Sequence, residues 1–278
     1  MRVTPLDEVL ERHRVPLFDA YGVLVDASGA RRGAVERIAG LRAQKRPFFV
    51  LTNDGSRLPD TCEARYRSLG LDIGRDDIIS TAGLLAGYYA QHALAGARTM
   101  MLGPGDARRA VLEGQGVIIP TAPDAALDVL VIADEAFQPF MQQCDDALSA
   151  LVRSIDAGRT PRLVLLNPDL IYPRGASGFG FTAGSVAAMF EGALRIRYRQ
   201  SAPSFVRLGK PFAAPYEEAV RRAGTRDLVM IGDQLDTDIA GAKRFGIASA
   251  LILGGVGSDP RELELADHEH PDYLLDAL

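Results

Sequence analysis

The sequence predicts an α/β protein: a doubly wound, mostly parallel, Rossmann-like sheet with a second α/β section inserted into it. Short apolar runs alternate with segments of helical periodicity along nearly the whole chain, a pattern typical of parallel strands joined by helices. Several of these runs end in polar residues, and open α/β sheets bind ligands beyond the carboxyl ends of their strands. The length of 278 residues is sufficient for two domains that each bury a core.

The first section of the chain opens with the apolar run 15–18, which ends at Asp19 and is followed by Gly22. Such runs are typical of buried strands. Helices and strands then alternate as far as His92. The expected elements are helices over about 4–13, 33–44, 60–69 and 82–92, and strands over 15–19, 48–51 and 78–81.

A second section has strands and helices of its own, and the first pattern resumes after it. In the second section we expect strands over 99–103, 127–133 and 163–166, helices over 106–114, 138–156 and from Ser185, and a glycine-rich loop over 175–184. After it we expect helices over 215–223 and 239–245, strands over 228–231 and 248–253, and a last apolar segment over 271–278. The predicted domains are therefore a core of residues 1–90 and 204–278 and an insertion of residues 91–203.

The composition limits the partners of the protein. A net charge of −5 and a pI near 5.5 disfavour nucleic acid, whose binding needs a basic surface. No apolar run reaches the ~20 residues that span a bilayer, and the first residues lack the apolar segment of a signal peptide. Cys62 and Cys144 are too few for a disulfide framework and fit a reducing compartment. We expect a cytoplasmic protein that binds a small molecule and neither nucleic acid nor a membrane.

Polar side chains follow three of the expected strands. Asp19 follows the first, Thr52 and Asn53 the second, and Asp233 and Asp238 a later one. If these strands are neighbours, the carboxylates meet at one edge and repel each other unless a cation lies between them. Mg²⁺ fits such a site because it prefers oxygen ligands, commonly one or two carboxylates together with phosphate and water. The pattern therefore indicates a site for Mg²⁺ and a phosphate group.

Lys210 precedes the last of these strands and adds a positive charge. A phosphate would then contact the metal, the Thr52 hydroxyl and the Lys210 ammonium. Attack of a carboxylate such as Asp19 on phosphorus gives an aspartyl-phosphate, and the metal and the lysine stabilise the transferring group. Each residue also has a structural explanation, since Thr52 and Asn53 are good helix caps, most lysines are exposed, and Asp238 suits a helix N-terminus. These residues alone leave both explanations open.

Four motifs, in this order, resemble those of the haloacid dehalogenase-like (HAD) superfamily of hydrolases. They are residues 18–24 (FDAYGVL), 50–53 (VLTN), 208–211 (LGKP) and 231–239 (IGDQLDTDI). The chain is most similar to class IIA, the group of p-nitrophenyl phosphatases, phosphoglycolate phosphatase and pyridoxal phosphate phosphatase, and residues 167–169 (NPD) resemble a segment of that class's cap. The resemblance spans nearly the whole chain. It implies a phosphatase for a small phosphorylated metabolite, with Mg²⁺ as cofactor and an aspartyl-phosphate intermediate.

The resemblance also implies roles for five residues of the core. Asp19 is the nucleophile and a Mg²⁺ ligand, and the backbone carbonyl of Tyr21 and the carboxylate of Asp233 are further ligands. Lys210 orients Asp19 and offsets its charge, and Asp238 supports the lysine or a metal-bound water.

Four further residues would contact the substrate. Thr52 and Asn53 bind the transferring phosphoryl group, and Asn167 and Asp169 lie on a loop that would face the substrate and set specificity. That loop belongs to the insertion 91–203, which resembles the large α/β cap domain of class IIA. The resemblance is compatible with a homodimer formed through this cap.

The sequence departs from the phosphatase pattern at Tyr21, where the resembling phosphatases carry a second aspartate that protonates the leaving oxygen and later activates water. General acid–base catalysis contributes about 10²–10⁴-fold, and a phenol with a pKa near ~10 is a poor base at neutral pH. Two alternatives therefore stay open. One is a weakly active or inactive relative that binds a phosphorylated metabolite, and the other is a carbon-centred hydrolase like the 2-haloacid dehalogenases, which share the letters DAYG of residues 19–22. The acidic pair Asp233 and Asp238 favours Mg²⁺ and phosphate over the dehalogenase.

Overall fold

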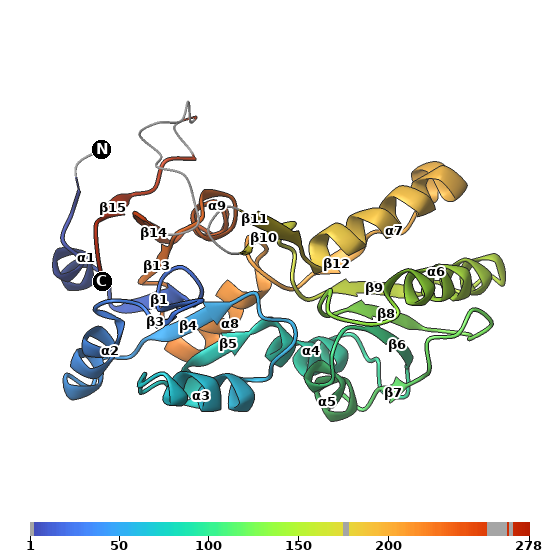
Figure 1. Ribbon diagram of the computed structural model, residues 1–278, viewed down its shortest axis with the longest axis horizontal. Helices are drawn as coiled ribbons and strands as arrows, with labels where there is room; N and C mark the ends of the chain where they lie inside the picture. Colours follow the sequence, from blue (N-terminus) through green and yellow to red (C-terminus); the bar gives the residue numbers. More distant parts are fainter. Residues whose placement is uncertain (1–2, 175–177, 255–265, 267–268) are drawn as a thin grey trace. The chain divides into compact units, whose positions relative to one another are not determined.

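The computed structural model describes residues 3–174, 178–254, 266 and 269–278, and the chain divides into two compact units. Unit 1 consists of Met1–Thr52, Pro59–Ser80 and Lys210–Leu278, and unit 2 consists of Asn53–Leu58 and Thr81–Gly209. Each unit contains a parallel sheet flanked by helices (Figure 1). The predicted fold class, a Rossmann-like α/β core with an inserted α/β domain, is confirmed.

The sheet of unit 1 has six parallel strands in the order β15-β14-β13-β1-β4-β5. The strands are β1 (Val15–Asp19), β4 (Phe49–Thr52), β5 (Ile78–Ser80), β13 (Leu228–Gly232), β14 (Ala248–Ile252) and β15 (Tyr273–Leu275). β1 lies between β4, which follows it in the chain, and β13, which comes after unit 2. The strand order therefore reverses at β1, and the carboxyl end of β1 is a switch point of the kind where α/β sheets bind ligands.

Helices cover both faces of this sheet. Phe18 and Val50 belong to one face, which packs on α1 (Leu6–Arg12), α2 (Ala34–Ala43) and α3 (Pro59–Ser68). Leu251 belongs to the other face and packs with Ile239, directly before α9 (Ala240–Phe245). Because side chains alternate along a strand, Asp19 points to the face opposite to that of Phe18.

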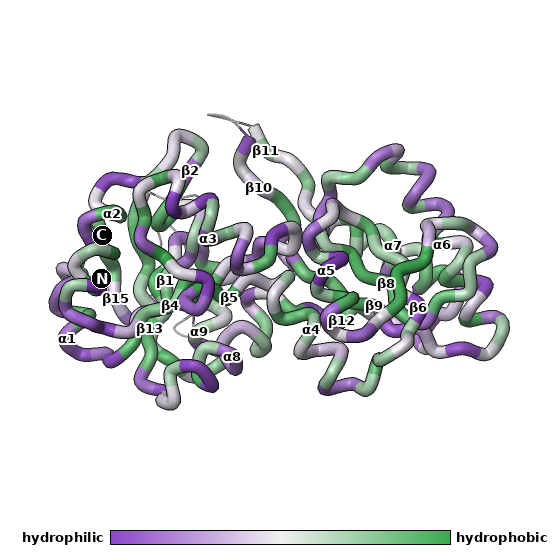
Figure 2. The backbone as a smooth tube through the Cα atoms, turned by 90° about the horizontal axis from the view of Figure 1, so that it is seen from below, coloured by the Kyte–Doolittle hydropathy of each residue, from purple (hydrophilic) through white to green (hydrophobic). Residues whose placement is uncertain are grey.

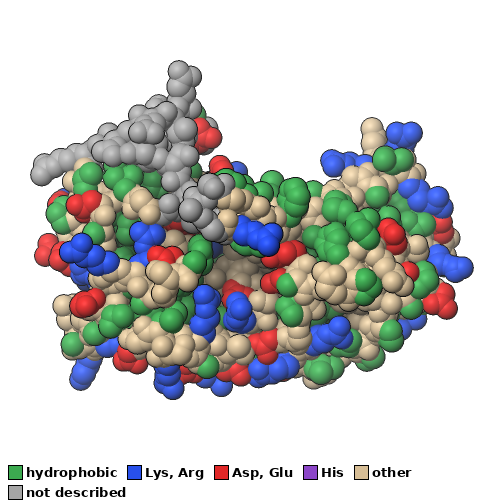
Figure 3. Space-filling model, in the orientation of Figure 1, with side chains coloured by type: hydrophobic (Ala, Val, Ile, Leu, Met, Phe, Trp, Pro, Cys, Tyr) green, Lys and Arg blue, Asp and Glu red, His purple; other side chains and the backbone are tan. Residues whose placement is uncertain are grey.

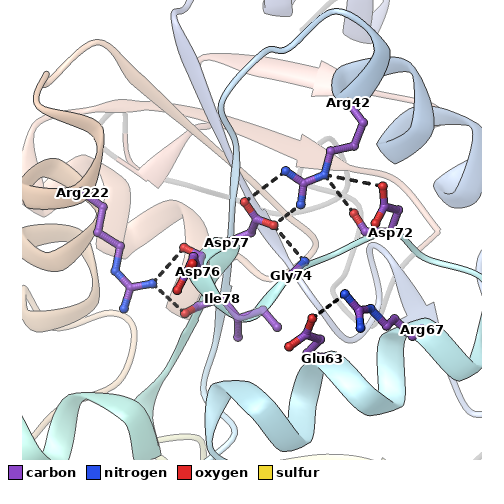
Figure 4. A network of polar contacts seen from close by, with 9 residues as sticks. All are labelled: Arg42, Glu63, Arg67, Asp72, Gly74, Asp76, Asp77, Ile78 and Arg222. Carbon is purple, nitrogen blue, oxygen red and sulfur yellow. Dashed lines mark hydrogen bonds and ion pairs between the residues drawn. The ribbon is translucent and has the colours of Figure 1, made fainter.

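The segment that enters β5 is held to unit 1 by two arginines (Figure 4). Arg42 of α2 pairs with the Asp77 carboxylate, which also accepts the N–H of Gly74 at 2.8 Å. Arg222, from α8 (Ala214–Ala223), donates to the carbonyls of Asp76 at 3.1 Å and Ile78 at 3.0 Å. These contacts fix the edge strand β5 between helices that are far apart in the sequence.

Unit 2 has a five-stranded parallel sheet in the order β12-β9-β8-β6-β7. Its strands are β6 (Arg98–Leu102), β7 (Val117–Ile118), β8 (Val129–Ile132), β9 (Arg162–Leu165) and β12 (Phe205–Arg207), and its helices are α4 (Thr81–Gln91), α5 (Asp106–Glu113), α6 (Phe140–Asp156) and α7 (Ala183–Tyr198). The apolar faces of α6 and α7 pack with one face of the sheet. Figure 2 shows the hydrophobic residues gathered along β8 and β9.

The boundaries of the units differ from those expected. The units change at residues 80 and 209, whereas we expected 90 and 203, and the short stretch 53–58 belongs to unit 2. Helix α4 belongs to unit 2 because it packs there, and the hydroxyls of Tyr89 on α4 and Thr99 on β6 are 2.6 Å apart. The later boundary lies at residue 209 and not at 203 because β12 pairs with β9. The sequence did not indicate this strand.

Two β-hairpins were not among the elements expected from the sequence. The segment expected as a glycine-rich loop over 175–184 contains a strand, because β11 (Gly178–Phe181) pairs antiparallel with β10 (Ile171–Arg174), while residues 175–177 lie outside the described residues. A second hairpin of β2 (Val25–Asp26) and β3 (Gly29–Ala30) follows β1. The two glycines of β11 interrupt the alternation of apolar and polar residues, so this short, exposed strand has no clear pattern in the sequence.

The surface carries charges of both signs. Basic and acidic side chains are interspersed with apolar and neutral ones on the face drawn in Figure 3. Among the described residues, the helices are all too short or too polar to cross a membrane.

Candidate active site

Asp19 lies at the carboxyl end of the central strand of unit 1. The whole of β1 is buried, and the Asp19 side chain retains 8% of its exposure. The chain then turns sharply at Gly22, whose φ of +93° belongs to the left-handed region that side chains other than glycine rarely adopt. The Asp19 carboxylate therefore lies at the switch point, and Gly22 allows the backbone to turn three residues after it.

Lys210 is the first residue of unit 1 after the insertion, and its ammonium lies between two carboxylates. Nζ donates to Oδ1 of Asp19 and to Oδ1 of Asp238, each at 2.6 Å. All three side chains are buried. A buried ion cluster of this kind needs several hydrogen bonds to offset the loss of hydration. The prediction that Lys210 meets Asp19 is confirmed, and the alternative of an exposed surface lysine is wrong.

Asp233 and Asp238 follow β13, which pairs with β1. A π-helical turn, Leu235–Ile239, directs the Asp238 carboxylate back toward the strand end, where Oδ2 accepts the N–H groups of Asp233 and Gln234 at 3.2 Å each. Gly232 makes this possible, because a Cβ at that position would overlap the Asp238 carboxylate. π-helical turns are frequent at functional sites.

Tyr216 is a buried member of this cluster that the sequence reasoning missed. Its hydroxyl donates to the backbone oxygen of Asp238 at 3.3 Å, and Gly241 lies so close that a Cβ would overlap the hydroxyl. Helical periodicity indicates that Tyr216 is buried, but nothing in the sequence pairs it with Asp238.

Burial and charge shift the pKa values of this cluster. Burial by itself would lower the pKa of Lys210, but the negative charges of Asp19 and Asp238 outweigh it and raise that pKa far above its usual value. Burial raises the pKa of Asp19 well above its usual value, and the neighbouring Asp238 and Asp233 add to the rise, while Lys210 opposes it. Three carboxylates therefore face a single ammonium here, and a second positive charge would relieve their repulsion.

The cluster fits a divalent cation. Asp19, Asp233 and Asp238 offer carboxylate oxygens that all lie within 4.8 Å of one another. Oxygen ligands of this kind suit Mg²⁺. Gly22 leaves room for the Asp233 carboxylate, because a Cβ on residue 22 would overlap it. Since Asp238 already binds Lys210 and two backbone N–H groups, Asp19 and Asp233 are the better candidates to hold the ion.

Two other predicted residues of unit 1 lie near the same strand ends. Tyr21 follows β1 and forms a bridge with Val25, and its side chain is 37% exposed. Thr52 is the last residue of β4, is half-buried, and pairs with Ser80 of β5. The structure therefore places a phenol where the resemblance expects the second aspartate.

The remaining predicted residues belong to unit 2, where two of them are bound to each other. Nδ2 of Asn53 donates to Oδ1 of Asp169 at 2.9 Å. Asn167 supports this loop, since its Oδ1 accepts the N–H of Asp169 at 3.0 Å. The structure thus brings four predicted residues together in unit 1 and three in unit 2.

Comparison with known proteins identifies relatives along the whole chain. Residues 16–118 match the family described as haloacid dehalogenase-like hydrolase, and residues 207–278 match the one described as HAD-hydrolase-like. D-Glycerol 3-phosphate phosphatase of Mycobacterium tuberculosis is 28% identical over 272 residues, which cover 97% of this chain and 71% of that protein. Dihydroxyacetone phosphatase of Corynebacterium glutamicum is 27% identical, with 87% and 82% covered.

Solved structures agree with these matches. A possible sugar phosphatase from Cytophaga hutchinsonii has a TM-score of 0.82 at 25% identity, with 100% of this chain and 98% of that chain covered. A glycerol phosphate phosphatase from Mycobacterium tuberculosis, solved with calcium, has a TM-score of 0.79 at 25% identity, with 96% and 74% covered. The two matched ranges span more than half of the chain and include the ends of β1, β4 and β13. The resemblance found in the four motifs is thereby confirmed, and the chain belongs to the haloacid dehalogenase-like hydrolases.

Proposed function

We propose that this chain is a Mg²⁺-dependent phosphatase that hydrolyses a small phosphorylated metabolite through an aspartyl-phosphate on Asp19. The observation that carries the proposal is the buried cluster at the end of β1, in which Lys210 binds Asp19 at 2.6 Å and Asp233 lies within reach of the same cation. The relatives are named phosphatases, which confirms the predicted enzyme class of phosphoric monoester hydrolase. The cytoplasmic location and the homodimer formed through unit 2 stay predictions.

In the proposed mechanism, a carboxylate oxygen of Asp19 bonds to phosphorus while the bond from phosphorus to the ester oxygen breaks. Water then attacks the aspartyl-phosphate, which releases inorganic phosphate and restores the carboxylate. Lys210 holds Asp19 in place and offsets its charge, and Asp238 holds Lys210. Mg²⁺ bound by Asp19, Asp233 and the Tyr21 carbonyl would stabilise the charge on the transferring group. Thr52 and Asn53 would bind the phosphoryl oxygens.

The relatives indicate the size of the substrate. Those named above act on glycerol phosphate and dihydroxyacetone phosphate, and others are sugar phosphatases. We infer that the substrate is a phosphate ester of a short polyol or sugar. Because position 21 carries a phenol and not a carboxylic acid, the leaving oxygen receives little help from a proton donor.

The test is hydrolysis of p-nitrophenyl phosphate and glycerol 3-phosphate with Mg²⁺ or EDTA. Wild-type protein should release phosphate only with Mg²⁺, and Asp19→Asn should abolish turnover because an amide cannot attack phosphorus. Asp26→Asn is the matched control, since Asp26 bonds to Ser28 in the neighbouring hairpin and should not affect the rate. Turnover that survives in Asp19→Asn would overturn the mechanism.

A second candidate is a protein that binds a phosphorylated metabolite without hydrolysing it. Tyr21 is the observation that favours it. Absence of wild-type turnover, together with turnover in Tyr21→Asp, would support this candidate, because the variant restores only the missing acid.

A further inference from the structure

Arg31 follows the hairpin of β2 and β3 and contacts the turn that comes after the proposed nucleophile. Its backbone N–H donates to the carbonyl of Leu24 at 2.9 Å, and its guanidinium donates to the carbonyl of Gly22. A second nitrogen of the same guanidinium donates to the carbonyl of Gly254 at 3.2 Å. Arg31 is half-buried, whereas the adjacent Arg32 is exposed. The Arg31 side chain therefore lies against the carboxyl end of the sheet of unit 1.

The two carbonyls that Arg31 binds with its side chain belong to segments on either side of β13. Gly22 follows β1, Gly254 follows β14, and the sheet order places β13 between these two strands. Asp233 directly follows β13. A guanidinium suits this position because its planar fork holds two acceptors in fixed directions, and a charged donor binds a carbonyl more strongly than a neutral one. Arg31 thus joins the two segments that flank the strand end of Asp233.

The turn that Arg31 holds lies directly against the Asp233 carboxylate. A Cβ on Gly22 would overlap Oδ2 of Asp233, so the backbone of Gly22 limits where this carboxylate can lie. The N–H of Gly22 donates to the carbonyl of Val25 at 2.8 Å, and the N–H of Val25 donates to the carbonyl of Ala20 at 2.9 Å. These bonds close the turn on itself, and the guanidinium of Arg31 ties the closed turn to the segment after β14.

We infer that Arg31 is a positioning residue for Mg²⁺, because it fixes the turn that carries the Tyr21 carbonyl and that limits the place of the Asp233 carboxylate. The inference rests on the proposed function and deepens it. Tyr21 and Asp233 are two of the three ligands proposed for the ion, and Gly22 adjoins the first in sequence and the second in space. Removing a group that orients metal ligands commonly costs about 10–100-fold in metal affinity. The charge of Arg31 has the opposite effect, since a nearby positive charge repels Mg²⁺.

Binding of Mg²⁺ separates the effect of Arg31 on position from the effect of its charge. The rise in Tm with Mg²⁺ concentration, starting from metal-free protein, gives the concentration that produces half of the full rise. Arg31→Met should increase this concentration roughly tenfold or more, although the loss of a positive charge by itself would decrease it. Arg31→Lys keeps the charge but lacks the planar fork, so it should also need more Mg²⁺ than wild type. Arg32→Met removes the same charge at the adjacent, exposed position and, as the matched control, should not need more Mg²⁺ than wild type.

Hydrogen exchange in EDTA tests the turn without metal or substrate. The Val25 amide, which donates within the turn, should exchange faster in Arg31→Met and Arg31→Lys than in wild type, while amides in the middle of β13 keep their rates. Unaltered exchange of the turn, or full Mg²⁺ affinity in either variant, would overturn the inference. A lower Tm in EDTA with unchanged Mg²⁺ affinity would overturn it as well, because Arg31 would then stabilise the fold alone.

These two measurements do not require turnover. If wild type binds Mg²⁺ but hydrolyses no phosphate ester, the proposed function fails, and the Mg²⁺ dependence of Tm and the exchange rates still decide the role of Arg31.

Discussion

The ammonium of Lys210 lies 2.6 Å from Oδ1 of Asp19, although 191 positions separate these residues in the chain. The whole of unit 2, together with residues 20–52 and 59–80 of unit 1, lies between them in the sequence. The contact therefore joins the first strand of the core to the first residue after the insertion. It places a fixed positive charge beside the carboxylate that we propose as the nucleophile.

Replacing Lys210 by methionine tests the value of this contact. The side chain keeps its approximate length but leaves Asp19 and Asp238 buried without their ammonium, and breaking a buried pair in this way costs about 3–5 kcal/mol. We expect a lower midpoint of urea unfolding and a fall in kcat of at least ~100-fold. Lys243→Met is the control, because Lys243 pairs with Asp272 at a more exposed site. Equal effects of the two substitutions would contradict the role of Lys210.

The raised pKa of Asp19 predicts a stability that depends on pH and on Mg²⁺. Its folded pKa lies above its unfolded value, because burial and the neighbouring carboxylates outweigh the attraction of Lys210. The ionised form therefore destabilises the folded protein at high pH, and this penalty disappears as the pH falls below the unfolded pKa of about 4. In EDTA at pH 8, Asp19→Asn should melt at a higher temperature than wild type, and the difference should vanish near that pKa.

Added Mg²⁺ should reverse this order. The ion relieves the repulsion among three carboxylates in wild type but finds a weaker ligand set in Asp19→Asn. Calorimetry of both proteins with and without Mg²⁺ measures the effect. A variant that is less stable than wild type in EDTA at pH 8 would mean that the attraction of Lys210 is the larger influence.

Tyr21 predicts a strong dependence of rate on the leaving group. Without a carboxylic acid to protonate the leaving oxygen, wild type should hydrolyse p-nitrophenyl phosphate, which releases a stabilised phenolate, much faster than glycerol 3-phosphate. Tyr21→Asp should narrow the ratio of the two kcat/KM values by roughly 10²-fold, within the range that general acid catalysis supplies. Tyr21→Phe keeps the ring and should retain the wild-type ratio. Equal acceleration of both esters by Tyr21→Asp would refute this reading.

Gly22 offers a comparison with a matched glycine. Gly22 and Gly29 both have a positive φ, of +93° and +130°, so alanine strains the backbone at either site, at a cost of about 1–3 kcal/mol. Only at Gly22 would the new Cβ overlap the Asp233 carboxylate, whereas at Gly29 the nearest atom is 3.9 Å away, on Leu69. Gly22→Ala should therefore raise the Mg²⁺ concentration needed for half-maximal activity, and Gly29→Ala should leave it unchanged. Titration of the activity with Mg²⁺ distinguishes the two variants.

Much of the site in unit 1 could be predicted from the sequence because β1, β4 and β13 are apolar runs that end in, or are directly followed by, polar residues. Asp19, Asp233 and Asp238 share one edge of the sheet, as their positions after strands indicate. Lys210 could be placed among them only through the motif resemblance, since a single lysine before a strand has no distinctive pattern.

The features that could not be predicted from the sequence have physical explanations. Tyr216 contacts the cluster from helix α8, and its hydroxyl reaches a backbone atom, for which the sequence holds no signal. The assignment of residues 53–58 to unit 2 depends on tertiary contacts such as the bond from the N–H of Leu58 to Asp106 at 2.7 Å. The pairing of Asn53 with Asp169 likewise depends on how a loop of unit 2 closes, and periodicity carries no information about it.

The central position of β1 has a consequence for the order in which the protein is made. β1 leaves the ribosome before the other strands of its sheet, and one of its two neighbours, β13, is synthesised more than two hundred residues later. Until then the strand that carries Asp19 has an open edge, while the sheet of unit 2 is complete once β12 has emerged. Domains generally fold as units during synthesis, so the insertion can fold while the core is still incomplete. A chain truncated before Leu228 would retain the nucleophile and Lys210, yet it would expose a hydrophobic strand edge and be prone to aggregate.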